Sequence, residues 1–88
     1  MKSLDPERLI RNCTGPDGRL KLLPVKPAKR QVILAHLAGQ FEMDCRYPER
    51  AVNEILKRFH DDYCTLRREL VDHGYLDRAG GEYWRASP

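Results

Sequence analysis

Few residues of this 88-residue chain are spaced for acid–base or metal chemistry. Asp61 and Asp62 directly follow His60, and together these side chains could transfer protons. His60 and Cys64 stand four positions apart, so they could share one face of a helix, but two ligands do not make a structural zinc site. The two carboxylates precede an apolar periodic segment, where capping of a helix is the simpler role. We therefore expect no catalytic residue, no metal and no cofactor.

Catalytic sequence motifs are also missing from the chain. It contains no G-x-S-x-G sequence, no phosphate-binding P-loop and no dinucleotide-binding glycine pattern. The three cysteines, Cys13, Cys45 and Cys64, are odd in number and form no C-x-x-C pair, which favours a reduced, cytoplasmic compartment. No apolar run approaches 18 residues, and the first residues lack a hydrophobic export signal, so we expect neither a membrane span nor secretion. The sequence indicates a non-enzymatic protein.

The basic side chains are the more informative group, because their distribution is uneven. The net charge is +3 overall, yet residues 1–30 carry eight basic and three acidic side chains. Residues 61–73 carry two arginines against four acids. A basic segment can follow a phosphate backbone, whereas an acidic helix repels one unless its carboxylates are paired elsewhere.

Seven side chains are candidate contacts to double-stranded DNA. Lys26, Lys29 and Arg30 could form a basic arm, although an ordinary solvated arm has the same composition. On a predicted helix over 63–73, Thr65 and Arg68 would point outward toward the major groove of DNA. Because this helix is acidic, a role in packing alone fits it better. Arg78 and Arg85 lie on a predicted hairpin, where a wing would touch the minor groove or backbone, but exposed arginines are common on any surface.

Arg67 calls for a different interpretation from its neighbour. Adjacent helical residues point about 100° apart, so Arg67 and Arg68 cannot share a role. Leu66 and Leu70 define the buried face of the predicted helix, and Arg67 lies at the edge of that face. We expect Arg67 to be mostly buried in a structural ion pair with Asp62 or Glu54, or bonded to a carbonyl, and Arg68 to be more exposed. A phosphate contact by Arg67 is the alternative.

Four helices and one hairpin must position these side chains. Asp5 and Pro6 begin a short helix, and Pro27 opens a second over about 28–40, on which Arg30 and Gln31 should face water. Residues 19–23 are either a short strand or an extended arm, and 41–47 form a connection with at most one short extended piece.

The C-terminal half has its own stop and start signals. Pro48 at the first position and an acid after it begin a third helix, and Asp61 or Asp62 caps the fourth. Gly74 can end that helix in the left-handed conformation. The β-prone runs 75–78 and 82–85 are joined by 79–81, which contains two glycines and is typical of a hairpin.

This order predicts a mainly α fold with a small two-stranded hairpin, a winged helix-turn-helix. Residues 1–24 would form an N-terminal helix and basic arm, and residues 25–88 the winged-helix domain. The predicted core consists of Ile33, Leu37, Val52, Ile55, Leu56, Leu66, Leu70 and Leu76.

Most of the chain also resembles a known family. The resemblance rests on Tyr47-Pro48-Glu49, Val52-Asn53, Leu56, Asp62, Leu66-Arg67-Arg68-Glu69-Leu70-Val71, Gly74-Tyr75-Leu76-Asp77-Arg78 and Gly81-Glu82-Tyr83-Trp84. It extends from about residue 20 to the end and is to the prokaryotic domain of unknown function 2087. That family occurs as a small separate protein and as a segment joined to helix-turn-helix transcriptional regulators. Pro48 and Ala51 depart from its pattern, in which a capping Ser or Thr and a glutamate are usual.

The resemblance implies a transcription-related setting but supplies no activity. Together with the element order and the basic arm, it leads us to expect a transcription-associated domain that binds DNA weakly. The alternative is a protein-interaction or dimerisation module of a bacterial regulator, whose partner is a helix-turn-helix regulator or a second copy. An exposed apolar patch near the wing or the first helix would favour that alternative.

Overall fold

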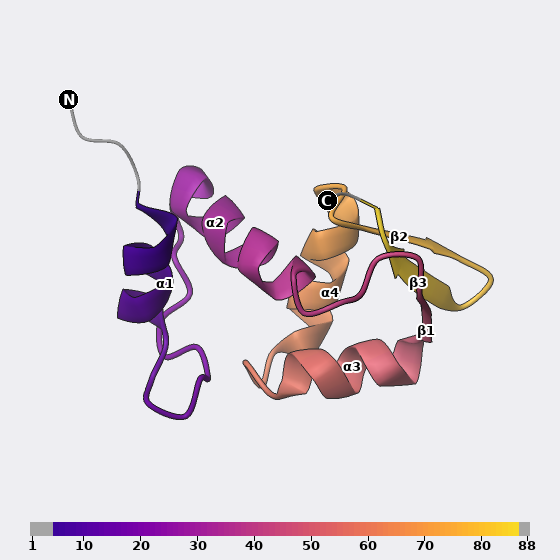
Figure 1. Cartoon of the computed structure of the whole chain (residues 1–88), viewed down its shortest axis with the longest axis horizontal. Helices are drawn as coiled ribbons and strands as arrows, with labels where there is room; N and C mark the ends of the chain where they lie inside the picture. The colour runs from indigo at the N-terminus through magenta and orange to yellow at the C-terminus, as the bar shows by residue number, and fades with distance from the viewer. Residues whose placement is uncertain (1–4, 87–88) are drawn as a thin grey trace.

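The computed structural model describes residues 5–86 as a small α+β domain with four helices and one three-stranded antiparallel sheet (Figure 1). The helices and strands are α1 Pro6–Cys13, α2 Pro27–Ala38, β1 Arg46–Pro48, α3 Glu49–Lys57, α4 Tyr63–Asp72, β2 Leu76–Ala79 and β3 Glu82–Arg85. The outermost residues of the two predicted regions, 1–4 and 87–88, lie outside the described residues.

A proline stands at the start of α1, α2 and α3, as the sequence predicted, but in α3 it lies one position earlier than expected. The Asp5 carboxylate accepts a hydrogen bond from the backbone N–H of Arg8 at 3.3 Å, and Pro6 is the first residue of α1. Pro27 likewise opens α2. Pro48, expected at the first helical position, is instead the N-cap of α3 and ends β1. Proline cannot provide a side-chain cap, so α3 begins with none, as the departure from the family pattern suggested.

The end of α4 is closed by glycine. Gly74 has a φ of 80°, the left-handed conformation that most side chains disfavour. Its N–H donates to the carbonyl of Val71 at 3.1 Å, and the N–H of Tyr75 donates to the carbonyl of Leu70 at 2.8 Å. These two bonds are a Schellman motif, which satisfies carbonyls that the helix leaves open and turns the chain into β2.

The sheet is larger than the predicted two-stranded hairpin. Gly80 and Gly81 both have positive φ, 58° and 81°, as a type I′ turn between β2 and β3 requires. The strand order is β1-β3-β2, with Tyr47 of β1 and Arg78 of β2 both opposite Tyr83 of β3. β1 has only three residues, too few for a period in the sequence, and its structure depends on pairing with a strand far along the chain.

The predicted core is confirmed with one exception. Seven of its eight residues are at most 1% exposed, whereas Ile55 is only half-buried against the cluster. Cys13, Leu20, Leu34, Phe41 and Tyr83 also belong to the buried cluster. The N-terminal segment is therefore packed on the same core as the rest of the chain. The backbone N–H of Leu20 donates to the carbonyl of Phe59 at 2.7 Å, and residues 19–23 contribute one isolated bridge, between Leu20 and Thr14, rather than a strand.

The side of α2 that was expected to face water packs on α4 and the segment after it. Arg30 and Gln31 are both half-buried. The Tyr75 hydroxyl donates to the Gln31 side-chain oxygen at 2.8 Å, and Arg30 contacts Glu69. The expectation that Arg30 and Gln31 face water was wrong. Their position beside the apolar face of α2 does not reveal that Glu69 and Tyr75 lie opposite them in the fold. None of the helices described over residues 5–86 is long and apolar enough to cross a membrane.

Candidate nucleic-acid interface

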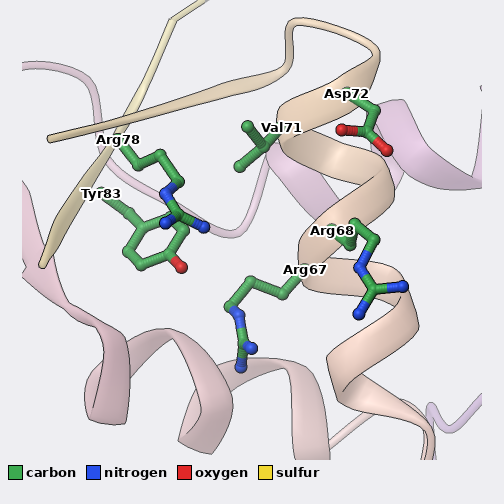
Figure 2. A pocket seen from close by; sticks show the side chains of 6 residues that line it. All are labelled: Arg67, Arg68, Val71, Asp72, Arg78 and Tyr83. Atoms are coloured by element: carbon green, nitrogen blue, oxygen red, sulfur yellow. The ribbon is translucent and has the colours of Figure 1, made fainter.

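A small hollow between α4 and the hairpin gathers three arginines; we call it the arginine pocket (Figure 2). Its volume is about 160 Å³, and it is lined by Arg67, Arg68, Val71, Asp72, Arg78 and Tyr83. The four α4 residues stand at positions i, i+1, i+4 and i+5 and so lie along one side of the helix. Arg78 of β2 and Tyr83 of β3 close the other side because the type I′ turn holds the two strands in register. The lining residues carry three positive charges and one negative charge.

Arg67 lies at the inner edge of the pocket. Its side chain is 19% exposed and points toward α3 in Figure 2. It donates to the Asn53 side-chain oxygen, and its Nε is 3.9 Å from Glu49 Oε1. Among the described residues, α3 thus supplies Glu49 and Asn53 in place of the predicted Asp62 or Glu54. Positions 49 and 53 are four apart and share the face of α3 that is turned to α4, while position 54 points about 100° away.

Arg68 and Arg78 present the accessible charge of the pocket. Arg68 is exposed, and none of the ion pairs formed within residues 5–86 includes it. The Arg78 guanidinium lies over the Tyr83 ring, 5.8 Å from its centroid, which orients the cation without neutralising it. The Tyr83 hydroxyl donates to Glu49 Oε1 at 2.9 Å. Burial, and then this hydrogen bond, raise the pKa of Tyr83, so its hydroxyl stays protonated at neutral pH.

Two of the four acids of residues 61–73 have arginine partners from elsewhere in the chain. Arg30 of α2 donates through Nε and Nη2 to both carboxylate oxygens of Glu69, each at 2.6 Å, and its Nη1 donates to the Pro24 carbonyl at 3.0 Å. The Arg30 hydrogen bond lowers the pKa of Glu69 below its usual range. Arg19 Nη2 lies 2.7 Å from Asp61 Oδ1. The acidic character of the α4 segment is therefore smaller at the surface than its composition indicates.

The remaining predicted contacts are spread over the molecule. Thr65 is half-buried on α4. Arg85 is half-buried and donates to the Phe41 carbonyl at 3.3 Å, so it holds the connection after α2. Lys26 and Lys29 are exposed at the start of α2, beside α1 and at the opposite end of the molecule from the hairpin (Figure 1). Arg30, the third member of the predicted basic arm, is held by Glu69.

Sequence reasoning missed Arg46 as a basic residue of the sheet. Its guanidinium lies 4.4 Å from the centroid of the Trp84 ring, and its Nη1 is 3.6 Å from Glu82 Oε1. Arg46 and Trp84 are register partners of β1 and β3. A signal for this contact could only have come from knowing that β1 exists.

Residues considered for proton or metal chemistry are engaged in other contacts. His60 Nδ1 accepts the backbone N–H of Asp62 at 3.0 Å, and Asp61 is bound by Arg19. Within residues 5–86, no group of three His, Cys, Asp or Glu side chains could hold a metal ion. Of the three free cysteines, Cys13 is buried and Cys64 is exposed.

A family model matches residues 19–85, which include the helices and strands that build the arginine pocket. The family is described as uncharacterized protein conserved in bacteria, DUF2087. The chain belongs to the DUF2087 family. The match agrees with the resemblance seen in the sequence and with its extent. No curated protein and no solved structure matches the chain. Within this DUF2087 domain, the arginine pocket brings together exposed positive charge from two elements, α4 and β2.

The two neighbouring arginines of the DUF2087 pocket should differ in their effects on folding. Arg67→Ala should lower the free energy of unfolding by about 1–3 kcal/mol, because it leaves the Asn53 side-chain oxygen without its donor, takes away the cation beside Glu49 and removes a packed stem. Arg68→Ala should change it by less than about 0.5 kcal/mol, since Arg68 is exposed. Urea denaturation of both variants measures the difference. Equal losses would contradict this assignment.

Proposed function

We propose that this domain is a non-enzymatic winged helix-turn-helix that binds double-stranded DNA in a transcription-related role in the bacterial cytoplasm. In this interpretation α3 and α4 form the helix-turn-helix, and β2 and β3 form the wing. The order of helices and strands and the sheet order β1-β3-β2 support it. Arg68, and Thr65 beside it, would face the major groove, with Arg68 on a phosphate at its edge, while Arg78 on the wing would contact another phosphate.

The observation that carries the proposal is the arginine pocket. Arg68 and Arg78 reach one hollow from two elements of the fold (Figure 2). Arg68 is exposed without an ion pair among residues 5–86, and Arg78 is oriented by Tyr83. Guanidinium groups bind phosphate oxygens through paired hydrogen bonds, so two of them around one hollow suit a phosphate backbone.

The acids of α4 weighed against DNA binding in the sequence, and two internal ion pairs reduce that objection. Glu69 is held by Arg30 and Asp61 by Arg19. Both arginines come from the N-terminal third of the chain. Part of the excess positive charge of that third therefore neutralises acids of residues 61–73. With Arg19 and Arg30 counted, residues 61–73 carry no net charge, and Glu49 of α3 beside Arg67 adds one negative charge.

Binding to a fluorescent DNA duplex, followed by anisotropy across a salt series, tests the proposal. The affinity should fall steeply with salt, with a logarithmic slope of about 0.9 for each phosphate contact. Arg68→Ala and Arg78→Ala should each weaken binding and reduce the slope by about 0.9 if each arginine contacts one phosphate. Arg8→Ala is the matched control, because Arg8 is an exposed arginine on α1.

Several outcomes would overturn the proposal. They are no binding at low salt, a slope unchanged in both pocket variants, or an equal loss in Arg8→Ala. Lys26→Ala and Lys29→Ala separate the pocket from the predicted basic arm. If the arm also follows the phosphate backbone, these two changes should flatten the salt slope further.

A further inference from the structure

A second hollow lies at the other end of the molecule, between α1, the segment that follows it and the start of α2. We call it the N-terminal groove and define it by Leu9, Leu22, Leu23, Val25, Lys26 and Lys29. Its volume is about 420 Å³, and most of these lining side chains are apolar. It shares no lining residue with the arginine pocket.

The groove exposes apolar side chains that could have been buried. Among residues 5–86, three large hydrophobic residues are exposed, and two of them, Leu22 at 59% and Val25 at 88%, line this groove. Single exposed hydrophobic residues are ordinary, but a cluster beside a hollow marks an interaction site. Pro24 and Pro27 restrict the backbone on either side of Val25, so this segment has little freedom to fold over the groove.

The charge at the groove indicates the kind of partner. Lys26 and Lys29 are exposed at its rim, and none of the described residues that line it is acidic. None of the ion pairs within residues 5–86 includes either lysine. A second copy would bring like charges together at this rim, whereas an acidic partner would complement it. An apolar floor offers nothing to a phosphate backbone, and an open groove buries a small ligand poorly.

We propose that the N-terminal groove binds an amphipathic helix of a partner protein whose polar face is acidic. Apolar side chains at positions i, i+3 or i+4, and i+7 of that helix would pack on Leu9, Leu23 and Val25. Its Asp and Glu side chains would lie opposite Lys26 and Lys29, which fixes the orientation of the helix and excludes basic helices. This site does not rest on the arginine pocket, with which it shares no lining residue.

A synthetic probe peptide tests the proposal on the full 88-residue chain. It carries leucines at i, i+3, i+4 and i+7 and glutamates elsewhere, and the reference peptide replaces each glutamate with lysine. By fluorescence anisotropy, the acidic peptide should bind at least about tenfold more tightly than the basic one. Backbone amide shifts in NMR spectra should change for the groove residues and not for those of the arginine pocket.

Two pairs of variants separate specific binding from general stickiness. Val25→Glu should weaken the acidic peptide about tenfold, while Met43→Glu, which changes an exposed hydrophobic residue outside the groove, should leave the affinity within about twofold. Lys29→Glu should weaken binding more than Arg50→Glu, since both are exposed cations in the first turn of a helix but only Lys29 lines the groove.

The proposal fails if both peptides bind equally, if the acidic peptide does not bind, or if each control variant loses as much affinity as its partner. Sedimentation of the free chain provides a further check. A dimer that Val25→Glu separates and Met43→Glu does not would assign the groove to a second copy instead.

Discussion

Replacement of Leu66 by alanine should lower the free energy of unfolding by about 2–5 kcal/mol. The Leu66 side chain is 0% exposed and lies in the same buried cluster as Val52 and Leu56 of α3 and Leu76 of β2. Loss of its branched end removes buried apolar surface and leaves a cavity that closely packed neighbours fill only in part. Urea denaturation, followed by the circular dichroism signal of the helices at 222 nm, measures the loss.

The same chemical change at Leu22 is the control, because that leucine is 59% exposed. Leu22→Ala should alter the free energy of unfolding by less than about 0.5 kcal/mol. For a domain of this size, each kcal/mol of lost unfolding free energy lowers Tm by about 4–8 °C. The Tm of Leu66→Ala should therefore be at least about 8 °C below that of the wild type. Similar losses at the two positions would mean that α4 presents a different face to the core.

The second large effect is expected at the ion pair between α2 and α4. Arg30→Met should lower the free energy of unfolding by about 1.5–3 kcal/mol, because Glu69 loses two charged hydrogen bonds at a site where its side chain is only 20% exposed. The Pro24 carbonyl loses a donor as well. A double-mutant cycle with Glu69→Gln isolates the interaction, and its coupling energy should be about 1–3 kcal/mol.

The pair between Arg46 and Glu82 is the matched control. Its closest atoms are 3.6 Å apart, and its side chains are 60% and 51% exposed, so solvent screens the attraction. The same cycle with Arg46→Met and Glu82→Gln should give a coupling energy below about 1 kcal/mol. Equal coupling in the two cycles would show that burial adds nothing to the Arg30–Glu69 pair.

The pair also predicts a direction for the pH dependence of stability. The Arg30 hydrogen bond lowers the pKa of Glu69 in the folded state, so folding favours the ionised carboxylate. Its contribution should be complete above the ordinary glutamate pKa, about 4.3. It should be lost as the pH falls from there through the lower pKa of the folded state. The difference in stability between the wild type and Glu69→Gln should therefore be constant near pH 7 and shrink below about pH 4.

Much of the local structure was predictable because its causes are local. Asp5 and Pro6 start α1 by a hydrogen bond within one turn, and Gly74 ends α4 because it adopts a positive φ at low cost. Two glycines between β-prone runs specify a tight hairpin. The helical spacing of Leu66 and Leu70 identified the buried face of α4 and placed Arg67 at its edge. Each inference needed only residues within a few positions of one another.

The site itself depended on contacts between distant parts of the chain. Arg30 and Glu69 are 39 residues apart, and nothing in the sequence near Arg30 distinguishes it from the solvent-exposed Lys26 and Lys29. Asp62 and Glu54 were reasonable partners for Arg67, but the crossing of α3 over α4 brought Glu49 and Asn53 to it instead. β1 exists because β3 supplies its hydrogen-bonding partners.

The sequence by itself thus determined, to within one or two residues, where helices and turns begin and end, and it also determined which apolar faces are buried and how basic charge is distributed along the chain. Only the tertiary structure decided which charges remain available at the surface. The reason is physical: periodicity and capping arise from neighbours along the backbone, whereas a long side chain finds its partner among groups that the packing of whole elements brings within about 3 Å. Arg30 is held in an ion pair with Glu69 of α4, whereas Arg68 and Arg78 are exposed to solvent at the arginine pocket.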